Sequence, residues 1–408
     1  MKLALLAFAC EPNRTSEPGV GWHVAAEMSS RHQTTVITRA NNQEVIEKFL
    51  KYYPEHPCNA LTFLYYDLPH WICVLKKKIP YGAQIYQELW NLVVARKYRT
   101  ILEKFDIVHQ VTFGAAFFTP YAARFCKRFV WGPIGGGDYP IPFSFLLGMG
   151  LKSCIMETIY RFATHYACRG SLIANYYRRR ASAIVFRTRE FKERMRSYGQ
   201  KLLATSLETA YTDVVEDRNY DEGARPLRIL MLGRLLPHKG VVLSVKAFSE
   251  FLRQGGEGEL VVCGSGVLDR KLRSLAKKLA ISDSVQFMGQ TEHNEAMRIM
   301  GGSDVLLHLS FREGGSWSIL EAMAHGLPII CQGKSGMDDM VGEDCGAKIK
   351  ANDAKTLIKE AAAVLFNYWR DRSIITLHGK NAQNRVKKEF KWERLADKLD
   401  KVYLELMK

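Results

Sequence analysis

Seven residues separate Glu313 from Glu321, in a segment that predicts a strand, a glycine turn and a helix. The apolar run 304–309 is typical of a buried strand, and Gly314 and Gly315 let a ligand approach the backbone without a Cβ in the way. Free N–H groups at the start of the helix favour anions such as a diphosphate, and the carboxylates accept hydrogen bonds from hydroxyl groups of a sugar or a ribose. The segment therefore predicts a binding site for a polar ligand.

The same segment also has a purely structural interpretation. The residues Ser318 to Glu321 fit the S-x-x-E capping box, in which Glu321 would only satisfy the start of its own helix. Short motifs of this kind often occur by chance, so the segment alone leaves both interpretations open.

A second set of candidates follows another expected strand, in the loop 233–240. Arg234 and Lys239 are suited to hold a diphosphate, since arginine offers a bidentate fork and lysine a point charge. The alternative is that both are simply exposed loop cations. We favour the binding role, because loops at strand ends are where ligands bind in this type of fold.

Further candidates occupy three other strand ends. Gly19 and Gly21 precede a helical pattern, and Gly264 follows the run 260–263; glycines at such junctions let a ligand approach backbone N–H groups. Gly19 and Gly21 lack the third glycine of the dinucleotide-binding motif. His109 ends a fourth strand, where a neutral imidazole could hydrogen-bond a sugar hydroxyl or serve a structural purpose.

Strand-like and helical patterns alternate along the whole chain and restart after residue 226. The expected strands are 3–8, 35–38, 61–66, 107–111, 128–131 and 183–186, and then 227–232, 260–263, 285–288, 305–309 and 329–331. This alternation predicts the α/β class, with two Rossmann-like, doubly wound parallel sheets. We expect the two domains to face a cleft, with ligands at the carboxyl ends of the strands.

The length of 408 residues favours two domains rather than one core. The patterns predict an N-terminal Rossmann-like domain over 1–208, a polar linker over 209–226 and a C-terminal Rossmann-like domain over 227–388. A terminal amphipathic helix over 389–408 is expected to pack back on the N-terminal domain.

Composition and charge narrow the classes of partner. The nine cysteines form no C-x-x-C pair, which favours reduced thiols and a cytoplasmic protein, and no apolar run is as long as a membrane span. The formal charge of +16 predicts attraction to anions. Basic clusters lie beside apolar residues, which suits an anionic membrane surface, although a solvated basic surface is the alternative. We expect 139–180 to contact membrane or a lipid-linked acceptor.

Taken together, these residues resemble the retaining family-four glycosyltransferases with the GT-B fold. The resemblance covers nearly the whole chain. It is carried by Gly19-Val20-Gly21, Gly233-Arg234, Lys239-Gly240, the E-x7-E motif of Glu313 and Glu321, Gly326, Pro328 and Trp392. It implies transfer of a sugar from a nucleotide-sugar donor to an acceptor hydroxyl, with retained anomeric configuration and without a metal or another cofactor.

The resemblance also implies roles for single residues. Arg234 and Lys239 would bind the donor diphosphate and stabilise the leaving phosphate. The donor sugar would contact Glu313, Gly314, Gly315 and Ser316, and the ribose would contact Glu321. Two positions depart from the family. His109-Gln110-Val111 replaces a His-x-His pattern, which puts a catalytic role of His109 in doubt, and Asp339 stands where a glutamate is usual.

Several alternatives stay open at this point. Retention could come from front-face attack or from a covalent intermediate on Glu11, Glu17 or Asp138. The same scaffold could serve a nucleotide-sugar epimerase or hydrolase, or a non-catalytic basic protein that binds nucleic acid or membrane. No nucleic-acid module is recognised, so no nucleic acid is expected. We favour a hexosyl- or related transferase in bacterial cell-surface polysaccharide or glycolipid synthesis, peripheral on the inner face of the membrane.

Overall fold

The computed structural model describes residues 1–79, 81–136, 140–146, 151–165, 172–195, 202–212, 216–221 and 223–408. The chain divides into two compact units. Unit 1 consists of Met1–Asp138, Phe162–Thr209 and Trp392–Lys408, and unit 2 consists of Tyr139–Arg161 and Ala210–Lys391. Each unit is built around its own parallel sheet.

In the described part of unit 1, seven parallel strands follow the order β3-β2-β1-β4-β5-β6-β7. Their bounds are β1 Lys2–Leu6, β2 Gln33–Thr38, β3 Thr62–Tyr65, β4 Ile107–Gln110, β5 Phe129–Ile134, β6 Ala183–Phe186 and β7 Leu202–Thr205. The order reverses direction between β1 and β4, where Leu5 pairs with His109. Because every ladder is parallel, the carboxyl ends of all strands lie along one edge.

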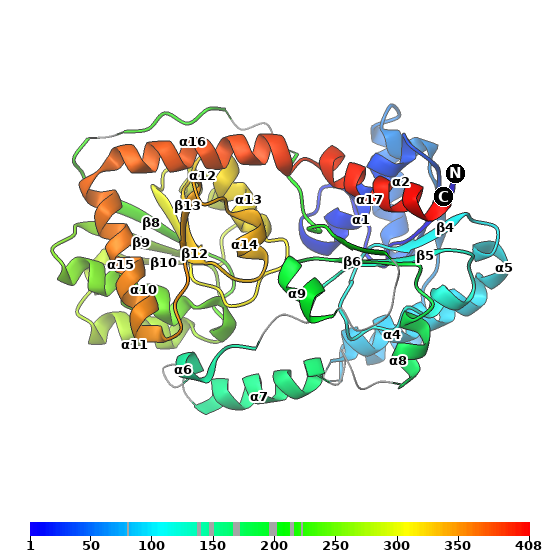
Figure 1. The fold of residues 1–408 in the computed structure, drawn as a ribbon, viewed down its shortest axis with the longest axis horizontal. Helices are drawn as coiled ribbons and strands as arrows, with labels where there is room; N and C mark the ends of the chain where they lie inside the picture. The colour runs from blue at the N-terminus through cyan, green and yellow to red at the C-terminus, as the bar shows by residue number, and fades with distance from the viewer. Residues whose placement is uncertain are drawn as a thin grey trace. The chain divides into compact units, whose positions relative to one another are not determined.

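Helices cover both faces of this sheet (Figure 1), with α1, α2 and α17 on one side and α4 and α8 on the other. The helices of unit 1 are α1 Ser16–Ser29, α2 Gln43–Tyr52, α3 His70–Leu75, α4 Gly82–Lys97, α5 Arg99–Leu102, α8 Leu172–Arg178, α9 Arg189–Arg194 and α17 Trp392–Met407. The strands β4 and β5 are buried along their whole length, as expected for apolar runs covered on both faces.

In the described part of unit 2, six parallel strands follow the order β10-β9-β8-β11-β12-β13. Their bounds are β8 Leu227–Leu232, β9 Gly258–Cys263, β10 Val285–Gly289, β11 Val305–His308, β12 Ile329–Gln332 and β13 Gly346–Ile349. Helices again flank both faces (Figure 1). The helix α10 is typical, because Val241, Val245 and Phe248 recur at helical spacing and are all buried in the core.

The remaining helices complete unit 2. They are α6 Phe143–Leu146, α10 Val241–Arg253, α11 Asp269–Lys278, α12 His293–Gly301, α13 Trp317–Ala324, α14 Gly336–Met340, α15 Ala354–Arg370 and α16 Arg372–Glu389. The helix α7 (Leu151–His165) begins in unit 2, and its last four residues belong to unit 1. The side chain of Asp353 caps α15 by accepting a hydrogen bond from the N–H of Thr356 at 2.9 Å.

The α/β class and the two parallel sheets predicted from the sequence are confirmed. Two strands were not predicted, β7 and β13, which lie at the ends of their sheets. All four residues of β7 are only half-buried, and β13 begins with glycine and contains a half-buried lysine. β13 therefore lacks a continuous apolar run, and the apolar run of β7, Leu202 to Ala204, is shorter than the four residues expected of a buried strand.

The segment 139–161 was assigned to the N-terminal domain from the sequence, but it packs with unit 2. Ile141, Phe145 and Leu146 lie in the hydrophobic core of unit 2, and the Phe145 ring meets the Phe311 ring edge-on at 5.0 Å. The chain thus leaves one unit, contributes a short piece to the other, and returns.

Apart from Thr209, the described residues of the expected linker belong to unit 2. The Tyr220 hydroxyl donates to the carbonyl of Gly326 at 3.0 Å, and Arg225 forms a two-pronged ion pair with buried Asp304. These contacts make the segment part of the unit 2 fold. Its polar composition suggested a linker, but polar side chains can equally form fixed hydrogen bonds.

The last helix, α17, packs on α1 within unit 1. Arg31 pairs with Asp397 at 2.8 Å, His32 lies 2.7 Å from Asp400, and the ring of Trp392 stacks on His23 at 4.6 Å. Among the described residues, no helix combines the length and the apolarity that crossing a membrane would require.

Candidate active site

Glycines end three neighbouring strands of unit 2 at the carboxyl edge of its sheet. Gly233, Gly264 and Gly289 follow or close β8, β9 and β10, with φ of +134°, +141° and +71°. A Cβ on Gly264 would lie 1.9 Å from the carbonyl oxygen of Gly233. Only glycine fits there, and the three loops consequently present bare backbone at this edge.

Arg234 and Lys239 lie in the loop that follows β8. The Arg234 side chain is exposed and has no hydrogen-bond or ion-pair partner within the described part of the chain. Lys239 ends the short 3-10 turn Pro237–Lys239, directly before α10. A Cβ on Gly240 would lie 1.9 Å from the carbonyl oxygen of Leu309, so this loop packs closely on the chain that follows β11.

Glu313 is the centre of a charged cluster with Lys239 of this loop and His308. Its Oε1 lies 2.5 Å from the Nζ of Lys239 and 2.8 Å from the Nε2 of His308, and the residue is 8% exposed. Burial raises the pKa of Glu313, but the hydrogen bond from His308 and the charges of His308 and Lys239 outweigh burial and lower the pKa below its ordinary value. Glu313 is therefore a carboxylate that accepts hydrogen bonds at neutral pH.

The turn after Glu313 is fixed by the start of α14. The N–H of Gly336 and the hydroxyl of Ser335 both donate to the carbonyl of Glu313, at 2.8 and 2.6 Å. A Cβ on Gly336 would lie 2.0 Å from the carbonyl oxygen of Gly314. Gly314 and Gly315 are thus held against a second strand-end loop, which keeps the backbone of the turn accessible on its other side.

The helix α13 begins at Trp317, with Ser316 as its N-cap. The Ser316 hydroxyl bonds the Ser318 hydroxyl at 3.1 Å, and the side chain of Ser316 caps no backbone N–H. Ser318 is the second residue of the helix and Glu321 the fifth, so Glu321 cannot reach back as the partner in a capping box. The capping-box interpretation of this segment is wrong.

Glu321 is buried on the same edge, and a histidine that sequence reasoning missed lies beside it. The Nδ1 of His293 is 3.9 Å from the Oε1 of Glu321, and the His293 side chain is half exposed. His293 opens α12, four residues after Gly289. Its place directly after a strand-end glycine is the signal by which it could have been found.

His109 lies in unit 1, away from any exposed surface. It is fully buried, its Nε2 is 2.6 Å from the carbonyl of Gly132, and its Nδ1 is 2.6 Å from the Tyr403 hydroxyl. Burial lowers the pKa of His109 to about 4, against the opposing effect of the Gly132 carbonyl. The carbonyl can only accept, so Nε2 carries the proton and Nδ1 accepts from Tyr403. These contacts give His109 a structural task, and its predicted catalytic role stays a prediction.

Gly19 and Gly21 lie within α1, not in the loop that the sequence suggested. A Cβ on Gly21 would lie 2.1 Å from the carbonyl oxygen of Ala9, so this glycine lets α1 pack on the chain after β1. Glu17, a candidate nucleophile, accepts from the N–H of Phe113 and pairs with Arg187, both at 2.7 Å.

Three other candidates can be placed only in part. Glu11 lies 3.5 Å from Arg14, and Asp339 lies in α14, where its carbonyl accepts from Arg385 at 3.4 Å. Asp138 falls outside the described residues.

A cluster next to Glu313 had no counterpart in the sequence analysis. Arg312 pairs with Glu157 of α7 and lies over the ring of Tyr160 at 3.7 Å. Glu157 is 3% exposed and also accepts from the N–H of Ile141 at 2.8 Å. The segment 140–161 is therefore attached to the loop that carries Glu313.

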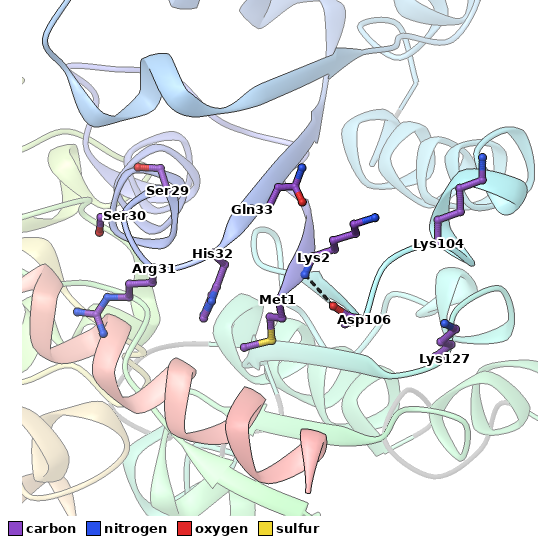
Figure 2. Close-up of a pocket in the computed structure, with 10 residues that line it drawn as sticks. All are labelled: Met1, Lys2, Ser29, Ser30, Arg31, His32, Gln33, Lys104, Asp106 and Lys127. Carbon is purple, nitrogen blue, oxygen red and sulfur yellow. Dashed lines mark hydrogen bonds between the residues drawn. The ribbon is translucent and has the colours of Figure 1, made fainter.

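An open cavity of about 660 Å³ lies elsewhere, in unit 1 (Figure 2). Lys2 and Gln33 open β1 and β2, and Asp106 and Lys127 closely precede β4 and β5, so this cavity lies at the amino edge of the sheet. Ligands of doubly wound sheets bind at the opposite edge. The cavity is therefore not the candidate active site.

Comparison with known proteins shows which family the C-terminal part of the chain resembles. Residues 216–385 match the model of the "Glycosyl transferases group 1" family. The uncharacterized glycosyltransferase MJ1069 of Methanocaldococcus jannaschii is 26% identical over 195 residues, covering 47% of this chain and 49% of that protein. The putative colanic acid biosynthesis glycosyltransferase WcaL of Escherichia coli is 30% identical over 147 residues, covering 34% and 36%. The chain thus matches between a third and a half of these curated relatives.

Solved structures match over nearly the whole length. The apo form of the lipopolysaccharide outer core galactosyltransferase WaaB has a TM-score of 0.65 at 15% identity, with 99% of both chains covered. Anabaena Alr3699/HepE in complex with UDP has a TM-score of 0.62 at 15% identity, with 99% of this chain and 100% of that chain covered. At such identities the likeness concerns the fold. Residues 216–385 therefore resemble the glycosyl transferases group 1 family, and the two units of the chain have the GT-B fold.

Proposed function

We propose that this protein transfers a sugar from a nucleotide-sugar donor to an acceptor hydroxyl, with the donor bound at the carboxyl edge of unit 2. The observation that carries the proposal is the cluster of Lys239, Glu313 and His308 beside exposed Arg234, at the ends of β8 and β11. An exposed arginine next to bare glycine backbone suits a diphosphate, and a buried carboxylate suits sugar hydroxyls.

In this proposal each cluster residue has a distinct task. Arg234 and Lys239 bind the diphosphate, and their charges stabilise the phosphate that leaves when the glycosidic bond of the donor breaks. The ionised carboxylate of Glu313 accepts hydrogen bonds from the donor sugar, next to the backbone of Gly314 and Gly315. Glu321 accepts from the ribose.

We further propose that the transfer retains the anomeric configuration, by front-face attack, and needs neither metal nor cofactor. Two cations at the edge can carry much of the charge of a leaving diphosphate. The contacts of Glu17 support the front-face route, since this carboxylate is already engaged by Arg187 and the Phe113 N–H and is poorly placed to act as a nucleophile.

The acceptor is proposed to be a saccharide or a lipid-linked saccharide at the inner, anionic face of a bacterial membrane. Relatives named for colanic acid and amylovoran biosynthesis support a polysaccharide acceptor. In the segment 139–180, which the sequence predicted to contact membrane, α7 turns Ile155, Ile159 and Phe162 outward while it buries Glu157. Parts of that segment, 147–150 and 166–171 among them, lie outside the described residues.

The nature of the donor is the first question for experiment. A matching structure holds UDP-glucose, whereas a relative from Corynebacterium glutamicum is named as GDP-mannose-dependent. Thermal unfolding with UDP-, GDP- and ADP-sugars should show a higher melting temperature with the true donor, because a ligand of the native state stabilises it by mass action.

The decisive variants are Arg234→Ala and Lys239→Ala, with Lys277→Ala in exposed α11 as the matched control. Both site variants should lose the donor-induced shift and the transfer of labelled sugar, and the control should keep both. Wild-type behaviour of the two site variants would remove the proposal. Sugar released to water in place of transfer would instead identify a hydrolase.

A further inference from the structure

We propose that one face of unit 1 docks on an anionic lipid bilayer. This surface, the α3–α4 face, is formed by α3, residues 76–79 and 81 after it, and the outward side of α4. Its exposed apolar residues are Trp71, Val74, Leu75, Ile79, Tyr81, Ile85 and Leu89. The inference depends on the proposed function only in what docking would achieve, which is to bring the enzyme to a lipid-linked acceptor.

The amount of apolar surface on this face is unusual for a solvated helix pair. The structure describes every residue of α3, and none of them is buried. Trp71 of α3 is 66% exposed, and Tyr81, just before α4, is 70% exposed. Single exposed apolar side chains are normal, but a contiguous group marks an interaction site. Here each of the seven residues is more than a third exposed, and all lie within one stretch from 71 to 89.

The inward side of α4 fixes which residues point out. Tyr86, Trp90 and Val94 are buried in the core of unit 1. The Tyr86 hydroxyl donates to Asp67 at 2.5 Å, and the indole of Trp90 donates to the carbonyl of Tyr66 at 2.8 Å. With this side held by hydrogen bonds and packing, α4 cannot roll to bury its outward apolar residues.

The corner between the two helices is equally fixed. A Cβ on Gly82 would lie 2.1 Å from the carbonyl oxygen of Lys76, so the first residue of α4 packs directly on the C-cap residue of α3. The ammonium group of Lys76 lies 4.2 Å above the Tyr86 ring. The α3–α4 face is therefore a preformed surface.

The charge of this face selects an anionic partner. Residues 70–104 include seven lysines and arginines but only two acidic residues. Lys77 and Lys78 are exposed, while the acidic Glu88 is engaged by the N–H of Thr119 and the hydroxyl of Tyr121. Lysines beside apolar and aromatic residues form the composition that binds the surface of anionic bilayers.

A bilayer fits this composition better than a protein partner does. Lysine is depleted in protein interfaces, whereas here three lysines in a row lie between the apolar residues of α3 and those of α4. Tryptophan and tyrosine are enriched where protein meets lipid headgroups, and Trp71 and Tyr81 flank the lysines on either side. Phospholipid headgroups would meet the ammonium groups while the rings and aliphatic side chains enter the acyl boundary.

The test is co-sedimentation of the full chain with vesicles of phosphatidylcholine, with and without phosphatidylglycerol. One variant, Lys77→Gln with Lys78→Gln, removes charge, and a second, Trp71→Ser with Leu75→Ser, removes apolar contact. Their controls are Lys277→Gln with Lys278→Gln and Leu377→Ser, at exposed positions in unit 2. All these side chains are exposed, so the melting temperatures should stay close to that of the wild type.

We expect the wild type to bind only the vesicles that contain phosphatidylglycerol. The lysine variant should bind them roughly 10- to 30-fold more weakly, the value for two lysines near an anionic surface. The serine variant should also lose binding, and both controls should keep it.

Three results would overturn the inference: equal binding to phosphatidylcholine alone, an unchanged affinity of the lysine variant, or an equal loss in the unit 2 lysine control. The last result would mean that net charge alone drives binding. Donor-induced thermal shifts, measured on the same variants, separate this inference from the proposed function. If nucleotide sugars fail to bind while the vesicle results hold, only the proposed function fails.

Discussion

The carboxyl edges of the two sheets use charged residues in opposite ways. In unit 1, Arg39 pairs with Asp67 at 2.8 Å, and Asp67 also accepts from the Tyr86 hydroxyl. In unit 2, the strand ends are bare glycine, and Arg234 is exposed without a partner in the described part of the chain. The charged side chains of the unit 1 edge bind one another, whereas Arg234 at the unit 2 edge stays available to a ligand.

This difference indicates which sheet is specialised for an anionic ligand. A guanidinium held by two hydrogen bonds to a carboxylate, as in Arg39, gains little from a phosphate, because the ligand must first displace the internal partner. An exposed guanidinium has no such competitor. An ammonium group has three donors, so Lys239 can hold Glu313 and a phosphate together. Three of the four predictions below test this contrast, and one tests the buried core of unit 1. They run from the largest expected effect to the smallest.

Lys239→Ala should have the largest effect on activity. The variant removes a cation from the diphosphate and one of the two partners of buried Glu313. We expect transfer to fall about 10²- to 10³-fold, as when one preorganised group that stabilises developing charge is removed. Steady-state rates at saturating acceptor provide the measurement, and a fall no larger than that of Lys277→Ala would contradict the assignment.

Acid should destabilise the protein through its buried imidazole in unit 1. The pKa of His109 is lowered to about 4, so the folded state releases a proton that the unfolded state holds below its ordinary pKa of about 6.5. Stability is thus full above that ordinary value and is lost as pH falls toward the folded pKa, by on the order of 3 kcal/mol in total.

The measurement is the free energy of unfolding between pH 7 and pH 4, on the wild type and on His109→Gln. The variant should show a shallower loss with acid. Some loss should remain, because burial also lowers the pKa of His238 to about 4. An identical pH profile in the variant would show that His109 is not the group responsible.

Arg234→Ala tests the exposed cation of unit 2 by itself. Its side chain has no partner among the described residues, so stability should change by less than about 0.5 kcal/mol. Donor affinity should fall roughly 10- to 100-fold, the value of hydrogen bonds to a charged group. Arg234→Lys should restore only part of the affinity, because an ammonium cannot form the bidentate fork.

Asp67→Asn should show the converse behaviour at the unit 1 edge. The change leaves Arg39 without its carboxylate partner. The pair is largely buried, since the side chains of Arg39 and Asp67 are only 15% and 17% exposed. We expect a loss of about 1 to 2 kcal/mol in unfolding free energy and no change in donor affinity. A weakened donor affinity at unchanged stability would break the comparison between the two edges.

The inner strands were predictable because most of them contain an apolar run covered on both faces. Val305–His308 is an example, with three apolar residues in a row, and it is buried throughout. The placement of 139–161 was not predictable, because no local pattern shows that Phe145 packs on Phe311, 166 residues later. Such a contact depends on the tertiary fold alone.

The candidate site, too, was predictable only in part. Arg234, Lys239 and Glu313 were found because they follow strands, and parallel strands bring their carboxyl ends to one edge. The structure places Lys239 and Glu313 in direct contact. The pairing of Arg312 with Glu157 escaped, because Glu157 comes from a distant segment with no motif around it. The start of α13 at Trp317 was likewise not predictable, because the residue before it contacts a residue from another helix. The N–H of Ser316 donates to the sulfur of Met340 at 3.4 Å.

The crossing of 139–161 into unit 2 determines how the protein can be dissected. A recombinant fragment cut at 210 and 391 would retain Arg234, Lys239 and the E-x7-E motif but lack Ile141, Phe145 and Glu157. Phe311 would then be stripped of an aromatic neighbour and Arg312 of its counterion, one residue before Glu313. An isolated donor module should therefore include 140–161 as a covalently tethered or separately added peptide.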